Sequence, residues 1–217
     1  MNARRLVVLA LFISALFGSR SGIAADNTAR QRLDFFLKDL STLSSDFEQR
    51  VFDESGALLE TSFGNLQVTK PGKFVWVYMK PYHQTITSDG KTLWLYDEEL
   101  AQVTVNAVEK NAAGSAAQLL GGNVDIDSQY TVKELGVREG KRWVRLSPKN
   151  REQQYSAVEV GLSDNTLAVM RLSDSLGQIT ELRFLALRRN PVLDGSRFVV
   201  VPPPGVDVVT GTTGAGK

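Results

Sequence analysis

The sequence predicts a mainly β protein: one antiparallel sheet of about 11 strands, curled or closed on itself, preceded by a helix. Three observations lead to this prediction. Apolar residues recur at helical spacing near the start of the chain, and the period falls to two after residue 46. Gly, Asn, Asp and Pro then separate short apolar runs as far as residue 201. No internal repeat or linker interrupts the 217 residues, so we expect a single domain.

The first 25 residues have the layout of a secretory signal peptide. Arg4 and Arg5 precede an apolar run of 12 residues, and small residues then lead to Ala24 and Ala25. The run is shorter than the roughly 20 residues that span a bilayer, so we expect cleavage after Ala24 or Ala25 and export of the remainder. The chain contains no Cys, which excludes both a disulfide and a thioether-linked lipid anchor.

Residues 27–43 are predicted to form an amphipathic helix. Their apolar positions recur every three or four residues, and charged residues occupy much of the rest. We therefore expect this helix to pack on the sheet. The apolar positions are Leu33, Phe36, Leu37, Leu40 and Leu43.

Short segments of period two follow the helix and are separated by turn residues. Asp89-Gly90 between two apolar runs is a strong signal for a two-residue hairpin. Gly64, inside a predicted strand, indicates a bulge or bend. The predicted strands are 46–52, 58–69, 74–79, 84–88, 91–96, 102–108, 130–135, 142–146, 157–162, 167–174, 179–187 and 197–201.

Residues 109–127 break the strand pattern. Ala116 to Leu120 form a short apolar turn of helix, and Gly121-Gly122 ends it. A connection this long between strands is often a lid or a binding loop. From these residues alone, a movable lid and a helix that plugs one end of a barrel are equal alternatives.

Most catalytic and metal sites are excluded by the side chains available. With His83 as the single His and no Cys, most triads, dyads and metal clusters are impossible. Asp125 and Asp127 lack the further ligands of a calcium loop. Residues 211–217 fit Gly-x4-Gly-Lys but lack the following Ser or Thr and helix of a phosphate-binding loop. The near-neutral charge argues against nucleic acid. We expect no catalytic residues, metal or cofactor.

The segment 74–79 is apolar on both faces. Val75, Val77 and Met79 alternate with Phe74, Trp76 and Tyr78. An antiparallel strand with one face in water alternates apolar and polar residues, so each face of this strand must be covered. The N-terminal helix can cover one face. A second packed layer or an apolar cavity can cover the other, and the run 93–96 repeats the pattern.

Four blocks of sequence resemble the LolA family of lipoprotein carriers. Gly64 to Trp76, GNLQVTKPGKFVW, is similar to the family pattern Gly-x-Leu-x-Val-x-(Arg/Lys)-Pro-x-x-Phe-x-Trp. Residues 88–96 resemble the next family block, Phe47-Glu48-Gln49 the opening strand, and Phe198 to Val206 the C-terminal strand and turn. The blocks keep their order from about residue 30 to 208.

The resemblance implies a curved antiparallel half-barrel with short lid helices over a hydrophobic cavity. Lys70 would hold the lid through backbone carbonyls of the lid, where many family members have Arg. Phe74 would lie at the cavity mouth. Residues expected to bind acyl chains are Phe74, Trp76, Tyr78 and Leu93, and those expected on the lid are Leu119 and Leu120.

The resemblance also implies a function. The chain would be a periplasmic chaperone that takes acylated lipoproteins from an inner-membrane ABC transporter and delivers them to an outer-membrane receptor. It would be a monomer, with the carrier domain at residues 26–208 and a flexible tail at 209–217. The alternatives are a periplasmic lipoprotein sensor or glycolipid-binding module of the same fold, an enzyme on an antiparallel β scaffold, and a closed structural barrel.

Overall fold

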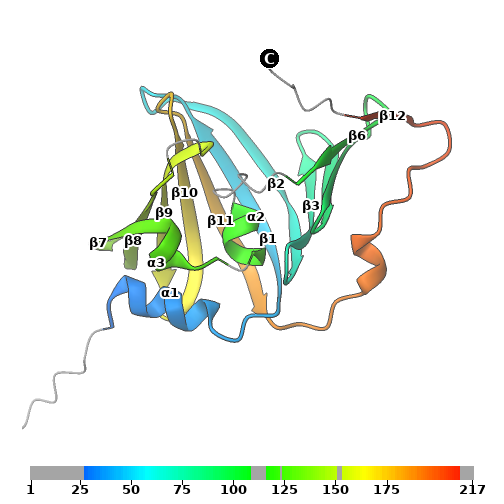
Figure 1. The fold of residues 1–217 in the computed structure, drawn as a ribbon. Helices are drawn as coiled ribbons and strands as arrows, with labels where there is room; N and C mark the ends of the chain where they lie inside the picture. The colour runs from blue at the N-terminus through cyan, green and yellow to red at the C-terminus, as the bar shows by residue number, and fades with distance from the viewer. Residues whose placement is uncertain (1–26, 109–115, 123, 151–152, 211–217) are drawn as a thin grey trace, which may run out of the picture.

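One curved sheet makes up most of the molecule (Figure 1). The computed structural model describes residues 27–108, 116–122, 124–150 and 153–210, so the predicted signal peptide lies outside the described residues. The sheet has 12 strands in this part of the chain, close to the predicted number of about 11. The strands are β1 (Thr42–Phe52), β2 (Leu58–Thr69), β3 (Lys73–Lys80), β4 (Gln84–Asp89), β5 (Thr92–Asp97), β6 (Gln102–Ala107), β7 (Tyr130–Arg138), β8 (Lys141–Pro148), β9 (Tyr155–Ser163), β10 (Thr166–Asp174), β11 (Ile179–Arg189) and β12 (Asp207–Thr210).

The sheet consists of two antiparallel meanders that meet at β1 and β11. Its order is β12-β6-β5-β4-β3-β2-β1-β11-β10-β9-β8-β7. Each neighbouring pair is antiparallel except β12 and β6, which are parallel. β12 and β7 do not pair with each other, so the sheet is open and forms a half-barrel, as predicted.

Cross-strand register places large apolar side chains on the inner, concave face. Leu66 of β2 lies opposite Trp76 of β3, which lies opposite Ile86 of β4. Gly64 lies opposite Phe47, and a Cβ at Gly64 would come within 2.7 Å of the Phe47 ring. The β2–β3 register shifts at Gly64, which confirms the predicted bulge.

Three helices cover the inner face: α1 (Ala29–Leu37), α2 (Ala116–Gly121) and α3 (Ile126–Gln129). α1 packs on β7 to β10, and α2 packs on β2 and β3 (Figure 1). Thr28 and Gln31 form a capping box that starts α1. Arg30 of α1 pairs with Asp127 of α3 at 2.7 Å, which ties the two helices together. One continuous apolar cluster joins the helices to the sheet.

The predicted helix over 27–43 is wrong at its end. The helix stops at Leu37, and Asp39 turns the chain with a φ of 54°. Leu43 is fully buried, but as part of β1. The three-residue spacing between Leu40 and Leu43 matches a helical period by coincidence, because both side chains are buried although Leu43 belongs to a strand.

A C-terminal arm covers the outer face of β3 and β4. After β11 the chain forms a 3-10 helix, η1 (Gly195–Phe198), which packs on these strands (Figure 1). Phe198 is buried there. The predicted strand at 197–201 is therefore wrong, because the Asp194 side chain accepts a hydrogen bond from the Ser196 N–H and caps a helical turn. The tail predicted from residue 209 begins inside β12.

Candidate functional site

Three aromatic side chains form the centre of the inner wall. The Phe47 ring lies 4.9 Å from the Trp76 ring and 5.3 Å from the Tyr78 ring, measured between centroids. The Tyr78 hydroxyl donates a hydrogen bond to Gln49 Oε1 at 2.9 Å. Burial raises the pKa of Tyr78 to about 12, so the phenol stays neutral at physiological pH. Trp76 and Tyr78 share one face, as alternation along the strand requires.

Helix α2, which the sequence predicts to be a lid, is docked on this wall. Leu119 and Leu120 are buried in the apolar cluster together with Trp76. The Gly121 carbonyl accepts a hydrogen bond from the Gly72 N–H at 2.8 Å. A Cβ at Gly121 would lie 2.8 Å from a methyl carbon of Val68, so the close approach of the helix depends on glycine. The part of the inner face beside α2 is therefore covered by protein side chains.

Lys70 lies in the turn between β2 and β3, near the lid. Its backbone N–H donates to the Ser41 carbonyl at 2.8 Å, and burial lowers the pKa of its ammonium. Among the described residues, the Lys70 ammonium makes no hydrogen bond or ion pair. The hydrogen bond from this turn to α2 comes from the Gly72 backbone instead. Residues 109–115, at the start of the predicted lid segment, lie outside the described residues.

Phe74 and Leu93 lie toward the periphery of the inner face. Phe74 is half-buried and packs against the apolar cluster. Leu93 lies on β5, two strands from β3 and therefore about 10 Å away, and does not join the cluster. The structure thus brings Phe74, Trp76 and Tyr78 together with Leu119 and Leu120 of α2, and leaves Leu93 apart.

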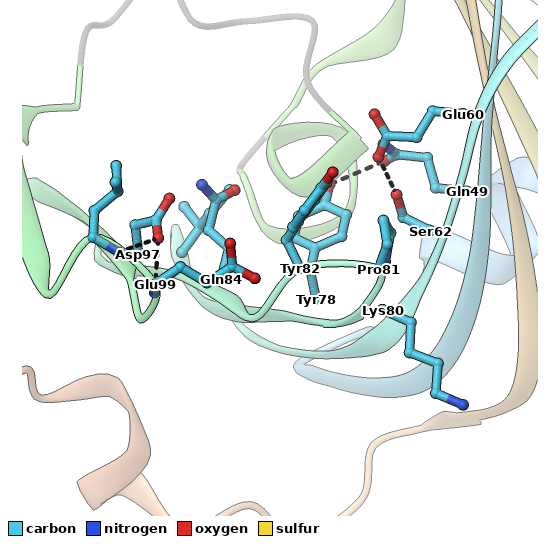
Figure 2. A pocket seen from close by; sticks show the side chains of 12 residues that line it. Gln49, Glu60, Ser62, Tyr78, Lys80, Pro81, Tyr82, Gln84, Asp97 and Glu99 are labelled. Atoms are coloured by element: carbon cyan, nitrogen blue, oxygen red, sulfur yellow. Dashed lines mark hydrogen bonds between the residues drawn. The ribbon is translucent and has the colours of Figure 1, made fainter.

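A pocket of about 420 Å³ opens at the far end of β3 (Figure 2). It includes Tyr78 and the turn after β3, whereas Phe74 is four residues back along the strand, about 13 Å away. Sequence reasoning missed this pocket because three separate hairpins build it. Its lining residues are Gln49, Glu60, Ser62, Tyr78, Lys80, Pro81, Tyr82, Gln84, Ile86, Asp97, Glu99 and Leu100.

Sequence reasoning also missed the position of Phe47 in the aromatic wall. The residue belongs to one of the four quoted blocks, but no role was assigned to it. Its strand pattern was the signal, because alternation from Leu43 through Phe47 places both on the buried face of β1.

The acidic residues considered for a metal have structural roles. The Asp125 carboxylate accepts hydrogen bonds from the N–H groups of Asp127 and Ser128 and caps α3. Within residues 27–108, 116–122, 124–150 and 153–210, no three His, Cys, Asp or Glu side chains are placed to hold a metal ion. None of the helices described is long and apolar enough to cross a bilayer.

Comparison with known proteins identifies the family. Residues 38–201 match the model of the family described as "Outer membrane lipoprotein carrier protein LolA", which is more than half of the chain. This chain belongs to the LolA family. A relative from Chromobacterium violaceum, named outer-membrane lipoprotein carrier protein, is 42% identical over 88% of this chain and 93% of its own. A LolA-family relative of the same name from Dechloromonas aromatica is 36% identical, over 94% and 99%.

A solved structure supports the fold of this LolA-family chain. The crystal structure of an uncharacterized conserved protein from Thermus thermophilus superposes with a TM-score of 0.53. The superposition covers 83% of this chain and 95% of the other, at 13% sequence identity. At that identity the likeness concerns the fold alone.

Proposed function

We propose that this chain is a periplasmic carrier of acylated lipoproteins. It takes them from an inner-membrane ABC transporter, shields their acyl chains, and delivers them to an outer-membrane receptor. It acts as a monomer and catalyses no reaction. The observation that carries this proposal is the apolar inner wall of the half-barrel, which is covered by a short docked helix rather than by a second sheet.

The lid makes reversible loading energetically reasonable. Each CH₂ group of an acyl chain that leaves water contributes about 0.8 kcal/mol. An acyl chain that takes the place of α2 exposes Leu119 and Leu120, which costs about 1.5–3 kcal/mol for each side chain. It also breaks the hydrogen bond between Gly72 and Gly121. The net affinity is therefore well below the full transfer energy of the acyl chains, which suits a carrier that must release its cargo without nucleotide.

The turn between β2 and β3 is the proposed control point for the lid. Gly72 holds the end of α2 through its backbone, and Phe74 follows two residues later on the inner face. In our proposal acyl chains enter past Phe74, and Lys70 offers a flexible ammonium donor to lid carbonyls. Trp76 and Tyr78 then form the wall that the acyl chains contact, with Leu93 at its edge.

A release assay tests the carrier function. The mature protein, beginning at Asp26, is added to spheroplasts that retain an active transporter, and the supernatant is probed for lipoproteins bound to it. Release that depends on the added protein is the expected result. Folded protein that releases no lipoprotein would contradict the proposal and favour a lipoprotein sensor or a glycolipid-binding module.

A further inference from the structure

The pocket at the end of β3 begins where the apolar cluster ends. Tyr78 belongs to both, because its ring contacts Phe47 in the cluster and its side chain also lines the pocket. Ile86, on the neighbouring strand, likewise packs against the cluster and lines the pocket. A molecule whose apolar part lay against Phe47 and Trp76 would therefore extend past Tyr78 directly into this pocket.

The pocket walls carry an excess of negative charge. Glu60 of β2 lies on one side of the pocket, and Asp97, at the end of β5, lies with Glu99 of the β5–β6 turn on the other (Figure 2). The single cationic side chain in the lining, Lys80, points away from the other side chains in Figure 2. A cationic group inside the pocket would thus be attracted by three carboxylates, and an anionic group would be repelled.

Local hydrogen bonds hold this charge arrangement in place. The Asp97 carboxylate accepts hydrogen bonds from the N–H groups of Glu99 and Leu100, both at 3.0 Å, which fixes the turn that presents Glu99. The Glu60 carboxylate accepts a hydrogen bond from the Ser62 hydroxyl. The negative walls are therefore built into two of the three hairpins, β1–β2 and β5–β6, and precede any ligand.

Apolar side chains flank the entrance. Tyr82 is 62% exposed and Leu100 is 70% exposed, and both line the pocket at the surface. The volume of about 420 Å³ lies within the range of about 300–1,000 Å³ that is typical of small-ligand sites. This combination of apolar floor, acidic walls and apolar entrance fits a short polypeptide segment better than a hydrocarbon chain.

We propose that this pocket binds the first residues of the cargo polypeptide, immediately after its acylated terminus, and prefers cationic or neutral residues to acidic ones. The inference rests on the proposed carrier function, since it places the polar end of a molecule whose acyl chains occupy the inner wall. It adds a second, charge-selective site to the carrier, at the opposite end of β3 from Phe74. In the loaded complex the acyl chains, having passed Phe74 while α2 is displaced, lie along β3 with their polar end beyond Tyr78.

Two synthetic lipopeptides test the proposal. Both carry the same dipalmitoylated cysteine, followed by four lysines in one and four glutamates in the other. Each displaces N-phenyl-1-naphthylamine from the mature protein, and the displacement curve gives its affinity. Exposed ion pairs are individually weak, so we expect the lysine lipopeptide to bind roughly three- to tenfold more tightly at low salt, and less so at high salt.

The double variant Glu60→Gln/Glu99→Gln should bring the two affinities close together, because only Asp97 then remains to offset Lys80 in the pocket lining. Glu139→Gln is the control, because it removes one carboxylate from an exposed turn at the opposite edge of the sheet and should preserve the preference. Thermal melts of all variants check that they fold.

The possible outcomes separate the two proposals. Equal binding of the two lipopeptides overturns the pocket assignment and leaves the carrier function standing. A preference that is undiminished in Glu60→Gln/Glu99→Gln also overturns it, because the selectivity then lies elsewhere. If neither lipopeptide displaces the probe, acyl chains do not bind the inner wall, and both proposals fail.

Discussion

At the scale of single residues, lipoprotein loading depends most directly on the apolar side chain of Phe74 in our proposal. It is half-buried against the apolar cluster and lies beside the contact between the turn and the lid. Phe74→Glu places a charge where acyl chains would enter, and an unpaired charge is costly in apolar surroundings. We expect lipoprotein loading in the release assay to fall at least roughly tenfold, since about 1.4 kcal/mol corresponds to tenfold.

Met79→Glu is the matched control for this variant. Met79 lies on the same strand but on the outer face, and its side chain is 41% exposed. The control should load normally. If Phe74→Glu accumulates cargo as well as Met79→Glu does, the mouth is not at Phe74.

Glu181 is a buried carboxylate whose role is stability. Its side chain is 4% exposed on β11 and accepts hydrogen bonds from Arg171 at 2.7 Å and Arg183 at 2.8 Å. Burial alone would raise its pKa, but the two arginine hydrogen bonds outweigh burial, so the pKa of Glu181 lies below its ordinary value. Ionised Glu181 therefore stabilises the folded state at neutral pH.

Glu181→Gln should lower the free energy of unfolding by about 2 kcal/mol at pH 7, because the amide cannot accept from both arginines. Since the folded pKa is lowered, this contribution is complete above the unfolded pKa of about 4.3 and is lost as the pH falls through the folded value. Urea unfolding from pH 7 to pH 3 should show the two proteins converging below about pH 4. A constant difference across that range would contradict the linkage, and Glu139→Gln should show little change throughout.

The residues of the site were predictable to different degrees. Lys70, Phe74 and Trp76 belong to the block Gly64 to Trp76, and strand alternation alone places Tyr78 on the same face as Phe74 and Trp76. Glu60 and Glu99 come from hairpins that carry no shared sequence signal. They become neighbours only through the curvature of the sheet, so the pocket they line could not be predicted.

At the scale of elements, the lid helix depends on one glycine. Gly121→Ala adds a methyl group that would lie 2.8 Å from Val68, in a helix end that is otherwise closely packed. Overpacking of this kind typically costs about 1–3 kcal/mol. We expect the variant to shift α2 away from β2 and to increase the binding of a hydrophobic fluorescent probe several-fold.

The double variant Gly121→Ala/Val68→Ala removes the clash and provides the control. A double-mutant cycle with Val68→Ala should give a favourable coupling, with probe binding restored toward that of the unmodified protein. Alanine is also a better helix former than glycine, by about 1 kcal/mol. If Gly121→Ala raises the stability of the protein and leaves probe binding unchanged, the helix accommodates the added methyl group and the expected clash does not occur.

Element boundaries were less predictable than element types. Most strands were found from their period of two, because alternation follows from one buried face. The end of α1 was missed because the turn at Asp39 depends on backbone conformation that apolar spacing does not report. The 3-10 helix at Gly195–Phe198 was missed because its buried Phe198 imitates a strand residue.

At the scale of the whole molecule, the meeting of β1 with β11 defines the half-barrel. Leu43 pairs with Arg189 and Phe52 with Ile179, across more than a hundred residues of sequence. The period of two predicts the strands but not which of them become neighbours, so the two-meander order could not be derived from the pattern. The parallel pairing of β12 with β6 could not be predicted from the sequence either, because it depends on where the C-terminal arm crosses the outer face of the sheet.

This arm also protects an edge of the sheet. β12 covers the β6 edge in a register that runs from Asp207 opposite Gln102 to Thr210 opposite Val105. An uncovered strand edge presents unpaired N–H and C=O groups to other chains. A chain truncated after Val206 should therefore self-associate in a concentration-dependent way, as measured by sedimentation velocity.

Truncation after Thr210 is the matched control, because it retains β12 and removes only the residues beyond it. The doubly substituted Val208→Ser/Val209→Ser is a second control, since it removes two exposed apolar side chains but keeps the backbone pairing. Both controls should sediment as monomers. If the chain ending at Val206 also stays monomeric, the exposed edge of β6 is too short or too twisted to recruit a second copy. If the serine variant associates like the truncated chain, the valine side chains, rather than the backbone pairing, keep β12 in place.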